Sequence, residues 1–529
     1  MGAYADGSGR CPPDVKPDLR ALAALAALLS GATGAGAGPA PSVAAAYSHL
    51  NWHNCDAYHE SFLCSELSVP IDYGRPADGS LKLAVIERPA TDAPVLGDIV
   101  INPGGPGDSG VQYLESESFY FPSELTDHFN LVSFDPRGVG QSDPVVCVGA
   151  SALVHKVLNF DPEPVTAAQV SSLASDEKAF ASSCAEHTSM TLLDNVGTAD
   201  TARDLDRIRA ALGQSKLNYL GLGYGTYLGE LYDEQYPGHV RAMVLDGVVD
   251  PALSSSAGTE QRAQALQGEL GDFFAWCDGN SLCRLKATWP CRATLPQGAA
   301  QAYHQLMSRL ADGYRPDAEL PPLDGEVQKV TLGVADEAVL ALLPYPGDWT
   351  DLAQAIQEAL AGFGGSLVSA AYGGSGLTAD GQLSSNYAAA DTAIGCADGI
   401  YTSAVTADEH LAARFAKTAP DFVFEAWVGS GCAYWPVKAE QKPAGVHVTG
   451  GRPVLLIGST ADPSTPYSWA QAVARQLGNA RLLTRDGPGH TAYFYSTCVQ
   501  TWTEQFFGTL ALPPKGTVCN SNNPDVILP

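Results

Sequence analysis

Short apolar runs recur along this chain, and most are nearly continuous in apolar residues rather than alternating with polar ones. Such runs are typical of strands that helices cover on both faces, and here they alternate with Gly-rich turns and stretches of helical period. The sequence therefore predicts an α/β fold with a mostly parallel central sheet. The expected strands are 82–86, 98–102, 129–134, 217–222, 240–245, 453–458 and 481–484.

The pattern changes between residues 251 and 450, where helical stretches rich in Ala, Leu and Gln, Cys-bearing loops and a Gly/Ser-rich segment replace the strands. This change predicts a mainly helical cap inserted between two strands of the sheet. The expected division is a leader at 1–46, a first core part at 47–250, the cap at 251–450 and a C-terminal core part at 451–529.

The leader has the features of a secretory signal peptide. Arg10, Lys16 and Arg20 precede an apolar run at 21–29 and a small-residue stretch at 30–40. This run is far shorter than the roughly 20 residues that cross a bilayer, so export is expected rather than membrane anchoring. A disordered Ala-rich tail is the alternative interpretation.

The net charge of the chain limits which classes of molecule it is expected to bind. The chain has 30 Lys and Arg against 58 Asp and Glu, which gives a formal net charge of 30 − 58 = −28. Such a chain is a poor partner for nucleic acid or an anionic membrane. The sequence also lacks a phosphate-binding loop, a metal-ligand cluster and a complete dinucleotide fingerprint, so we expect no metal and no cofactor.

The twelve cysteines are scattered, without the paired spacing of a zinc site. Disulfides in an oxidising compartment account for them better, which agrees with export. Short loops favour Cys55–Cys64, Cys277 with Cys283 or Cys291, and Cys498–Cys519, and sequence proximity favours Cys147–Cys184 and Cys396–Cys432.

The most informative segment is residues 217–226, where an expected strand enters a Gly-lined turn that is followed by an amphipathic helix. A strand, sharp turn and helix with the pattern G-x-S-x-G form the nucleophile elbow of α/β-hydrolases, in which glycines permit the strained turn. The pattern here is Gly221-x-Gly223-x-Gly225, so Gly223 stands where the serine is expected.

An acid and a histidine follow in the order that such a site requires. Asp462 comes directly after the expected strand 453–458, and His490 ends a Gly-rich turn after the strand 481–484. Nucleophile, acid and histidine is the α/β-hydrolase chain order, so Asp462 and His490 are the expected acid and base. Thr226 and Ser142 are the nearest alternative hydroxyls, and neither is well placed to attack.

A second Gly-rich loop, at 102–107, follows the expected strand 98–102. In acyl-transfer sites, backbone N–H groups of such a loop and of the residue after the nucleophile stabilise the developing oxyanion. Gly105 and Tyr224 are the expected donors.

Together these motifs resemble the tripeptidyl-aminopeptidase branch of the prolyl-aminopeptidase-like α/β-hydrolases, over about residues 52–519. The resemblance implies a secreted serine exopeptidase fold whose helical cap limits how much peptide fits beyond the amino end of the substrate. Two departures are Gly223 at the serine position and Asp108 where the family usually has another glycine. The motifs are Asn102-Pro-Gly-Gly-Pro-Gly107, Phe134-Asp-Pro-Arg-Gly-Val-Gly140, Gly221-x-x-Tyr-Gly-Thr226, Val244-Leu-Asp-Gly247 with Asp250-Pro251, Cys432-x-x-Trp-Pro436, Asp462-Pro-x-Thr-Pro466, Gly489-His490 and Gly516-Thr-x-Cys519.

A glycine at position 223 leaves no oxygen for a covalent acyl-enzyme. Three hypotheses follow. The first is a tripeptidyl-aminopeptidase-like hydrolase that is inactive or strongly impaired but still binds substrate. The second is a non-covalent enzyme in which His490 activates water or supports a lyase or cyclase step. The third is a secreted binding pseudoenzyme for a peptide or small molecule.

The free amino end of a bound peptide should meet a carboxylate. Asp398, in the expected cap, and Asp108, beside the Gly-rich loop, are the expected residues. The oligomeric state has no signature in the sequence.

Overall fold

The computed structural model describes residues 50–55, 61–281, 283, 285, 298–318, 320, 328–401, 404–439, 444–448 and 451–520. Within these residues, ten strands form one sheet in the order β1-β2-β3-β5-β4-β6-β7-β8-β9-β10. Strands β1, β2, β3 and β5 pair antiparallel, and all neighbours from β5 to β10 run parallel. The predicted mostly parallel sheet is therefore confirmed.

All seven expected strands are present, and β1, β2 and β10 extend the two edges of the sheet beyond them. The strands are β1 (His53–Asn54), β2 (Leu63–Pro70), β3 (Ser80–Arg88), β4 (Gly97–Asn102), β5 (Phe129–Phe134), β6 (Leu217–Leu222), β7 (Val240–Asp246), β8 (Leu455–Ala461), β9 (Arg481–Pro488) and β10 (Val518–Asn520).

The central strands are buried on both faces, which explains their continuous apolar runs. Successive residues such as Val100 and Ile101 enter two different hydrophobic clusters. Each such fully buried side chain contributes about 1.5–3 kcal/mol. One face is covered by α1 (Gly110–Glu117), α2 (Ser123–Thr126) and α16 (Thr497–Thr509), and the other by α6 (Thr198–Ala211), α7 (Gly225–Gln235) and α15 (Tyr467–Leu477).

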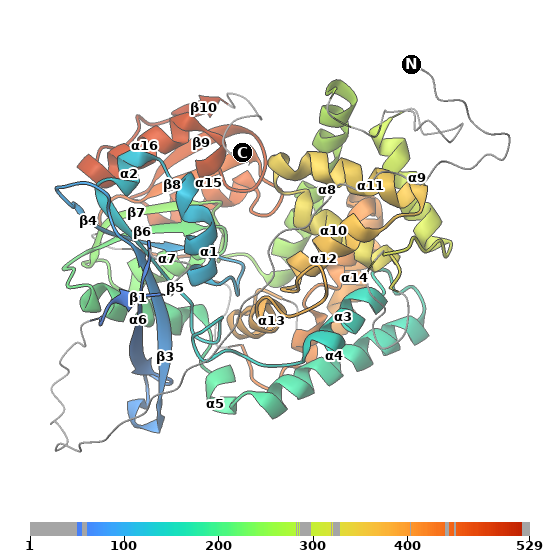
Figure 1. Cartoon of the computed structure of the whole chain (residues 1–529), viewed down its shortest axis with the longest axis horizontal. Coiled ribbons are helices and arrows are strands. Elements are labelled where there is room, and N and C mark those ends of the chain that lie inside the picture. The colour runs from blue at the N-terminus through green and yellow to red at the C-terminus, as the bar shows by residue number, and fades with distance from the viewer. Residues whose placement is uncertain are drawn as a thin grey trace.

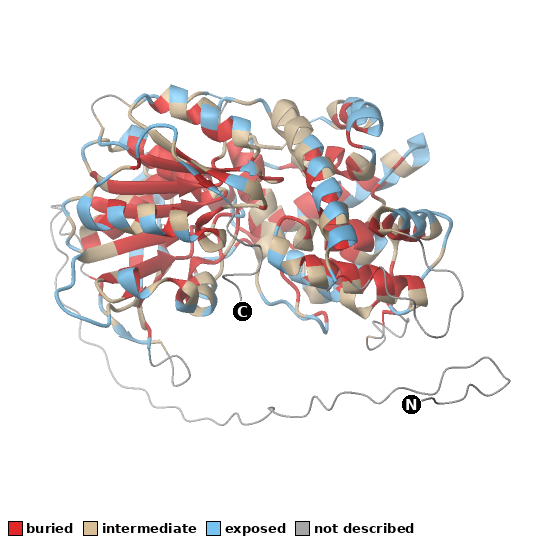
Figure 2. Ribbon diagram, turned by 90° about the horizontal axis from the view of Figure 1, so that it is seen from above, coloured by how far each residue is buried: buried red, intermediate tan, exposed pale blue. Residues whose placement is uncertain are grey.

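A second, helical lobe lies beside the sheet (Figures 1 and 2). It has a hydrophobic cluster of its own, to which α3 and α4 contribute although they precede residue 251. Helix α13 (Tyr387–Asp398) packs instead on the cluster of the sheet lobe. The helices that share the second cluster are α3 (Ala150–Asn159), α4 (Ala167–His187), α8 (Ser255–Gly279), α9 (Ala299–Ala311), α10 (Leu332–Leu342), α11 (Trp349–Ala361), α12 (Gly365–Gly374) and α14 (Val405–Thr418).

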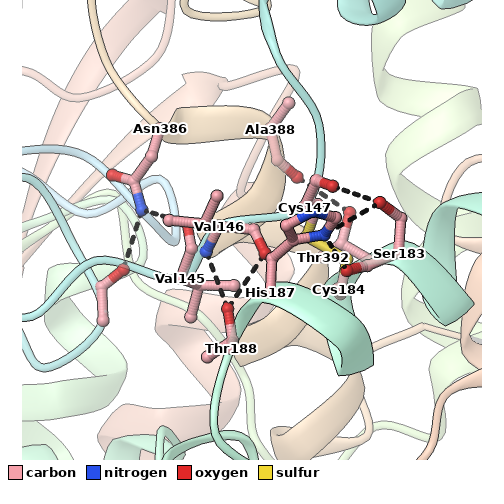
Figure 3. The surroundings of a disulfide bond; sticks show 11 residues. Val145, Val146, Cys147, Ser183, Cys184, His187, Thr188, Asn386, Ala388 and Thr392 are labelled. Carbon is pink, nitrogen blue, oxygen red and sulfur yellow. Dashed lines mark hydrogen bonds between the residues drawn. A yellow bond between two sulfur atoms is a disulfide. The ribbon is translucent and has the colours of Figure 1, made fainter.

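The loop after β5 is held by hydrogen bonds to Asn386 and by a disulfide to α4 (Figure 3). At the start of α13, the Asn386 amide donates to the carbonyls of Gly138 and Val145 at 2.8 and 3.0 Å, and its oxygen accepts from the Gly140 N–H. The Cys147–Cys184 disulfide ties the end of the same loop to α4. The loop is therefore fixed to α13 and to the end of α4.

The predicted disulfides form, and Cys277 pairs with Cys283 rather than Cys291, which lies outside the described residues. The others are Cys55–Cys64, Cys147–Cys184, Cys396–Cys432 and Cys498–Cys519. In the described part of the chain, no helix is long and apolar enough to cross a membrane.

Arg137 is the most buried cation of the sheet lobe and organises the loop after β5. Its guanidinium is fully buried and donates two hydrogen bonds of 2.7 Å to Asp204 on α6. It also donates to the carbonyls of Ile71 and Asn195, both at 2.8 Å. Bidentate pairing of this kind satisfies a buried charge that would otherwise be costly.

Replacing Arg137 with methionine is expected to lower the free energy of unfolding by about 3–5 kcal/mol, because Asp204 is then left as a buried, unpaired charge. Urea unfolding followed by circular dichroism measures this. Arg75→Met, which breaks the exposed pair with Asp72, is the matched control and should leave the midpoint nearly unchanged. Equal effects of the two substitutions would contradict the prediction.

Candidate active site

Gly223 lies at the sharp turn between β6 and α7. Its φ of +51° is in the left-handed region that favours glycine. Its N–H donates to the Asp246 carbonyl at 2.9 Å, and its carbonyl accepts from the Thr226 N–H at 3.0 Å. The turn is therefore held from both sides, and it presents position 223 at the carboxyl end of the sheet.

Asp462 and His490 form a hydrogen-bonded pair at the ends of β8 and β9. The imidazole Nδ1 lies 3.0 and 3.1 Å from the two carboxylate oxygens of Asp462. The buried carboxylate also accepts from the N–H groups of Ser464, Thr465 and Thr491. Burial lowers the pKa of His490, but the charge of Asp462, its hydrogen bond to the ring and the charge of Asp246 together outweigh burial, so the pKa is raised above its usual value.

The imidazole faces position 223. A Cβ atom placed on Gly223 would lie 2.8 Å from His490 Nε2. The opposite ring nitrogen, Nδ1, is the atom bonded to Asp462. An oriented base therefore points at the atom from which a nucleophilic side chain would extend, which is the relation between nucleophile and base in a triad.

Asp246, at the end of β7, positions the loop that carries His490. Its carboxylate accepts from the N–H groups of Ala492 and Tyr493 at 2.9 and 2.8 Å. Burial raises its pKa to about 6. We did not predict this role from the sequence, although an aspartate directly after an apolar strand was the pattern that could have indicated it.

The loop at 102–107 packs directly against the turn. A Cβ on Gly104 would lie 2.6 Å from the Leu222 carbonyl oxygen and 2.8 Å from the Tyr224 nitrogen, so only glycine fits. Among the described residues, neither Gly105 N–H nor Tyr224 N–H makes a turn or loop hydrogen bond. The chain just after this loop is fixed by Asp135, whose carboxylate accepts a hydrogen bond from the Ser109 hydroxyl at 2.5 Å.

The alternative hydroxyls are engaged elsewhere. Buried Thr226 donates to the Gly223 carbonyl at 2.7 Å and accepts from the Val249 N–H at 3.0 Å. Buried Ser142 donates to the Asp135 carbonyl at 2.7 Å and accepts from an N–H of β3. Neither hydroxyl has a hydrogen bond to His490.

Comparison with known proteins identifies the family. Residues 421–519 match the family described as "TAP-like protein". The chain is 32% identical to serine protease Hip1 of Mycobacterium tuberculosis over 464 residues, which cover 86% of this chain and 87% of that protein. The chain belongs to the tripeptidyl-aminopeptidase-like α/β-hydrolases. This confirms the resemblance and the fold class.

Two further relatives have the same identity to this chain. Tripeptidyl aminopeptidase of Streptomyces coelicolor is 32% identical over 466 residues, which cover 84% of this chain and 81% of that protein. Carboxylesterase B of Mycobacterium tuberculosis is 32% identical over 518 residues, which cover 95% and 96%. The chain therefore belongs to a family of serine hydrolases that includes peptidases.

In this TAP-like chain, the elbow and the histidine open into a cavity of about 1170 Å³ between the two lobes. This volume is slightly above the usual range for small-molecule pockets, and it can accommodate a short peptide. Both lobes line it, including Gly105, Gly223 and His490 from the sheet lobe and Arg262, Glu337 and Asp391 from the helical regions.

Both carboxylates that we expected near a peptide amine line the cavity, but their surroundings differ. The Asp398 carboxylate already has hydrogen-bond donors around it, because it accepts from the Thr198 N–H at 2.9 Å and from the Tyr224 hydroxyl at 2.6 Å. Asp108 has no such side-chain bond among the described residues, and burial raises its pKa to about 6.

Two further acids of the cavity escaped the sequence analysis. Burial raises the pKa of Asp391, which accepts from the Tyr401 hydroxyl, to about 7. Burial also raises the pKa of Glu337 to about 7. No motif marks either residue, since each reaches the cavity only because its helix packs there. Within the described residues, no group of three or more His, Cys, Asp or Glu side chains is arranged to hold a metal ion.

Proposed function

We propose that this protein binds short peptides through their free amino ends, and that Gly223 leaves it inactive or strongly impaired as a hydrolase. The single observation that carries this proposal is the 2.8 Å between His490 Nε2 and the Cβ position of Gly223. A base paired with Asp462 is thus aimed at a residue that has no oxygen to activate.

The proposed roles follow from that geometry. His490 is the base, Asp462 orients it, and Gly105 and Tyr224 supply N–H groups to a developing oxyanion. In a triad enzyme, removal of the nucleophile costs on the order of 10⁶ in kcat, while the remaining parts retain roughly 10³–10⁴ over water. Binding does not need the hydroxyl, so the cavity keeps its affinity for a peptide.

Asp108 and Asp391 are the acids that we propose for the peptide amine. Both carboxyls line the cavity, and their pKa values are raised by burial to about 6 and about 7. An ammonium group near them would compensate for buried negative charge. Asp398 is less suited, because its oxygens already accept hydrogen bonds from Thr198 and Tyr224.

Peptide affinity should therefore depend on pH. Below about pH 6 both acids are protonated and attract an ammonium weakly, so affinity rises as pH increases through 6 and 7 and falls above about 8, where an α-amino group loses its proton. We expect at least a tenfold increase between pH 5 and pH 7.5, measured by titration calorimetry with an alanine tetrapeptide amide.

The N-acetylated tetrapeptide is the control for this prediction, because it has no charge to pair with either acid. It should bind weakly and with little dependence on pH. Asp391→Asn should reduce the part of the rise near pH 7, while Asp108 and Glu337, which also line the cavity, still titrate near pH 6 and pH 7. Equal affinities of the free and acetylated peptides at every pH would show that the cavity does not recognise an amine.

The second candidate function is slow non-covalent chemistry, in which His490 activates a water or supports a lyase or cyclase step. The intact hydrogen bond between His490 and Asp462 favours it, because a pure binding site has no need for an oriented base. It differs from binding alone in requiring turnover that depends on His490.

We also propose that residues 1–46 direct export and that residues 251–450 form the cap, to which α3 and α4 add. The disulfides between described cysteines support an oxidising compartment. Edman sequencing of protein recovered from the culture medium would test export. A mature chain that begins near residue 47 supports it, and retention of the full chain inside the cell contradicts it.

A further inference from the structure

A loop from the helical lobe, residues 344–346, lies directly against the loop that carries His490. The His490 N–H donates to the Pro344 carbonyl at 2.8 Å. At Gly489, whose φ is +107°, a Cβ would lie 2.6 Å from Pro346 Cδ. The two loops are therefore in close backbone contact, and the helical lobe brings one specific side chain, Tyr345, to the imidazole.

The Tyr345 ring lies in the cavity beside the base. Its centroid is 6.3 Å from that of the His490 ring, and the two planes are tilted by 59°. The backbone is fixed on both sides, since the Tyr345 N–H donates to Leu342 and its carbonyl accepts from Asp348. The residue is nevertheless 38% exposed and lines the cavity.

More aromatic residues line the same cavity near His490, namely Phe494 and Tyr495 from η7 (Tyr493–Tyr495) and Tyr113 from α1. The ring of Phe494 makes an edge-to-face contact with the ring of Phe121, with 5.2 Å between the two centroids. The buried Tyr113 hydroxyl has no partner among the described residues.

These rings do not pair with Tyr345. Among the described residues, the only ring contact of Tyr345 is the one with His490. Aromatic side chains gain stability from ring contacts beyond the burial of their area. The open face of Tyr345 is therefore suited to a ring supplied by the ligand.

We propose that Tyr345, together with Phe494 and Tyr495, forms a subsite for an aromatic residue on the leaving side of the bound peptide. In peptide hydrolysis the histidine donates its proton to the leaving amine, so the residue after the scissile bond lies beside the imidazole. Tyr345 is the cavity aromatic in ring contact with that imidazole. This assignment rests on the proposed function, and it adds a preference for the residue that follows the bond.

Binding by the native chain tests this subsite without any need for turnover. The probes are the amides of Ala-Ala-Ala-Phe and Ala-Ala-Ala-Gly, both with free amino ends, and the N-acetyl form of the first, all measured by titration calorimetry at pH 7.5. We expect the phenylalanine peptide to bind at least about fivefold more tightly than the glycine peptide.

Tyr345→Ala should reduce this ratio to within about twofold, while Tyr345→Phe should preserve it because the ring is kept. Phe363→Ala is the matched control, since Phe363 is also an exposed aromatic residue of the helical lobe but does not line the cavity. It should leave the ratio unchanged.

The possible failures are distinct. If both free peptides bind more tightly than the acetylated one but equally to each other, the subsite is wrong and the proposed function stands. The subsite is also wrong if Tyr345→Ala weakens both peptides equally, which is the result expected if the ring only shields His490 from water. If no peptide binds, or acetylation has no effect, the proposed function itself fails, and the subsite fails with it.

Discussion

The Gly223→Ser variant is expected to react with a fluorophosphonate at residue 223 and to release amino-terminal peptides, whereas the native chain should do neither at a comparable rate. The new hydroxyl extends from the one Cβ position that faces His490 Nε2, and the base is already oriented by Asp462. Because loss of a triad nucleophile costs on the order of 10⁶ in kcat, the gain should reach at least about 10³-fold.

Steric contact and backbone strain at position 223 limit this gain in activity. A Cβ at 2.8 Å from Nε2 requires the imidazole to shift away from position 223, and the contacting atom is the far end of that side chain. Any side chain at φ +51° is also strained, at a cost of about 1–2 kcal/mol in stability. The variant should therefore be more active and slightly less stable.

Two control variants test whether the gained activity comes from a serine oxygen at position 223. Gly223→Ala adds the same strain without an oxygen and should stay unreactive. Gly247→Ser adds a hydroxyl beside the same ring, since a Cβ there would lie 3.0 Å from His490 Cε1, and it tests whether the oxygen must stand at position 223. If correctly folded Gly223→Ser chain is neither labelled nor active on a panel of peptide and ester substrates, the hydrolase interpretation is wrong.

Adding His490→Ala to the serine-restored chain is expected to remove nearly all of the gained activity, a loss of about 10⁵–10⁶-fold in kcat. The hydroxyl is a weak nucleophile without a base to take its proton, and His490 is the residue whose Nε2 faces it. Single-turnover assays with a chromogenic tripeptide substrate measure this loss. Asp462→Asn should cost less, about 10⁴-fold, because it disturbs the orientation of the imidazole but does not remove the base.

The same substitution in the native chain distinguishes the alternative functions. If native chain shows slow turnover that His490→Ala abolishes, while fluorophosphonates leave it unaffected, the water-activated mechanism is supported. If peptide affinity is retained without turnover in both native and His490→Ala chains, binding alone is the function. A serine-restored chain that keeps its activity after His490→Ala would contradict the proposed role of His490.

The sheet was predictable because each central strand is buried on both faces and therefore reads as one apolar run. The edge strands were missed for the opposite reason. β2 alternates buried and exposed residues along Leu63–Pro70, while β1 and β10 have only two and three residues. Helical periods between residues 251 and 450 indicated the helices that lie there, but the contribution of α3 and α4 to the same cluster was not predicted, because shared packing across a long sequence separation leaves no local pattern.

The residues of the site also differ in whether the sequence could predict them. The sequence by itself determined the Gly-lined turn at Gly223, the order of Asp462 and His490, and the missing oxygen, since these depend on backbone conformation and residue identity at the ends of neighbouring strands. Only the tertiary structure decided that Asp398 is occupied by Thr198 and Tyr224, and that Asp391 and Tyr345 reach the cavity. Those residues lie on packed helices or loops, where position follows from side-chain packing between distant segments rather than from any local signal.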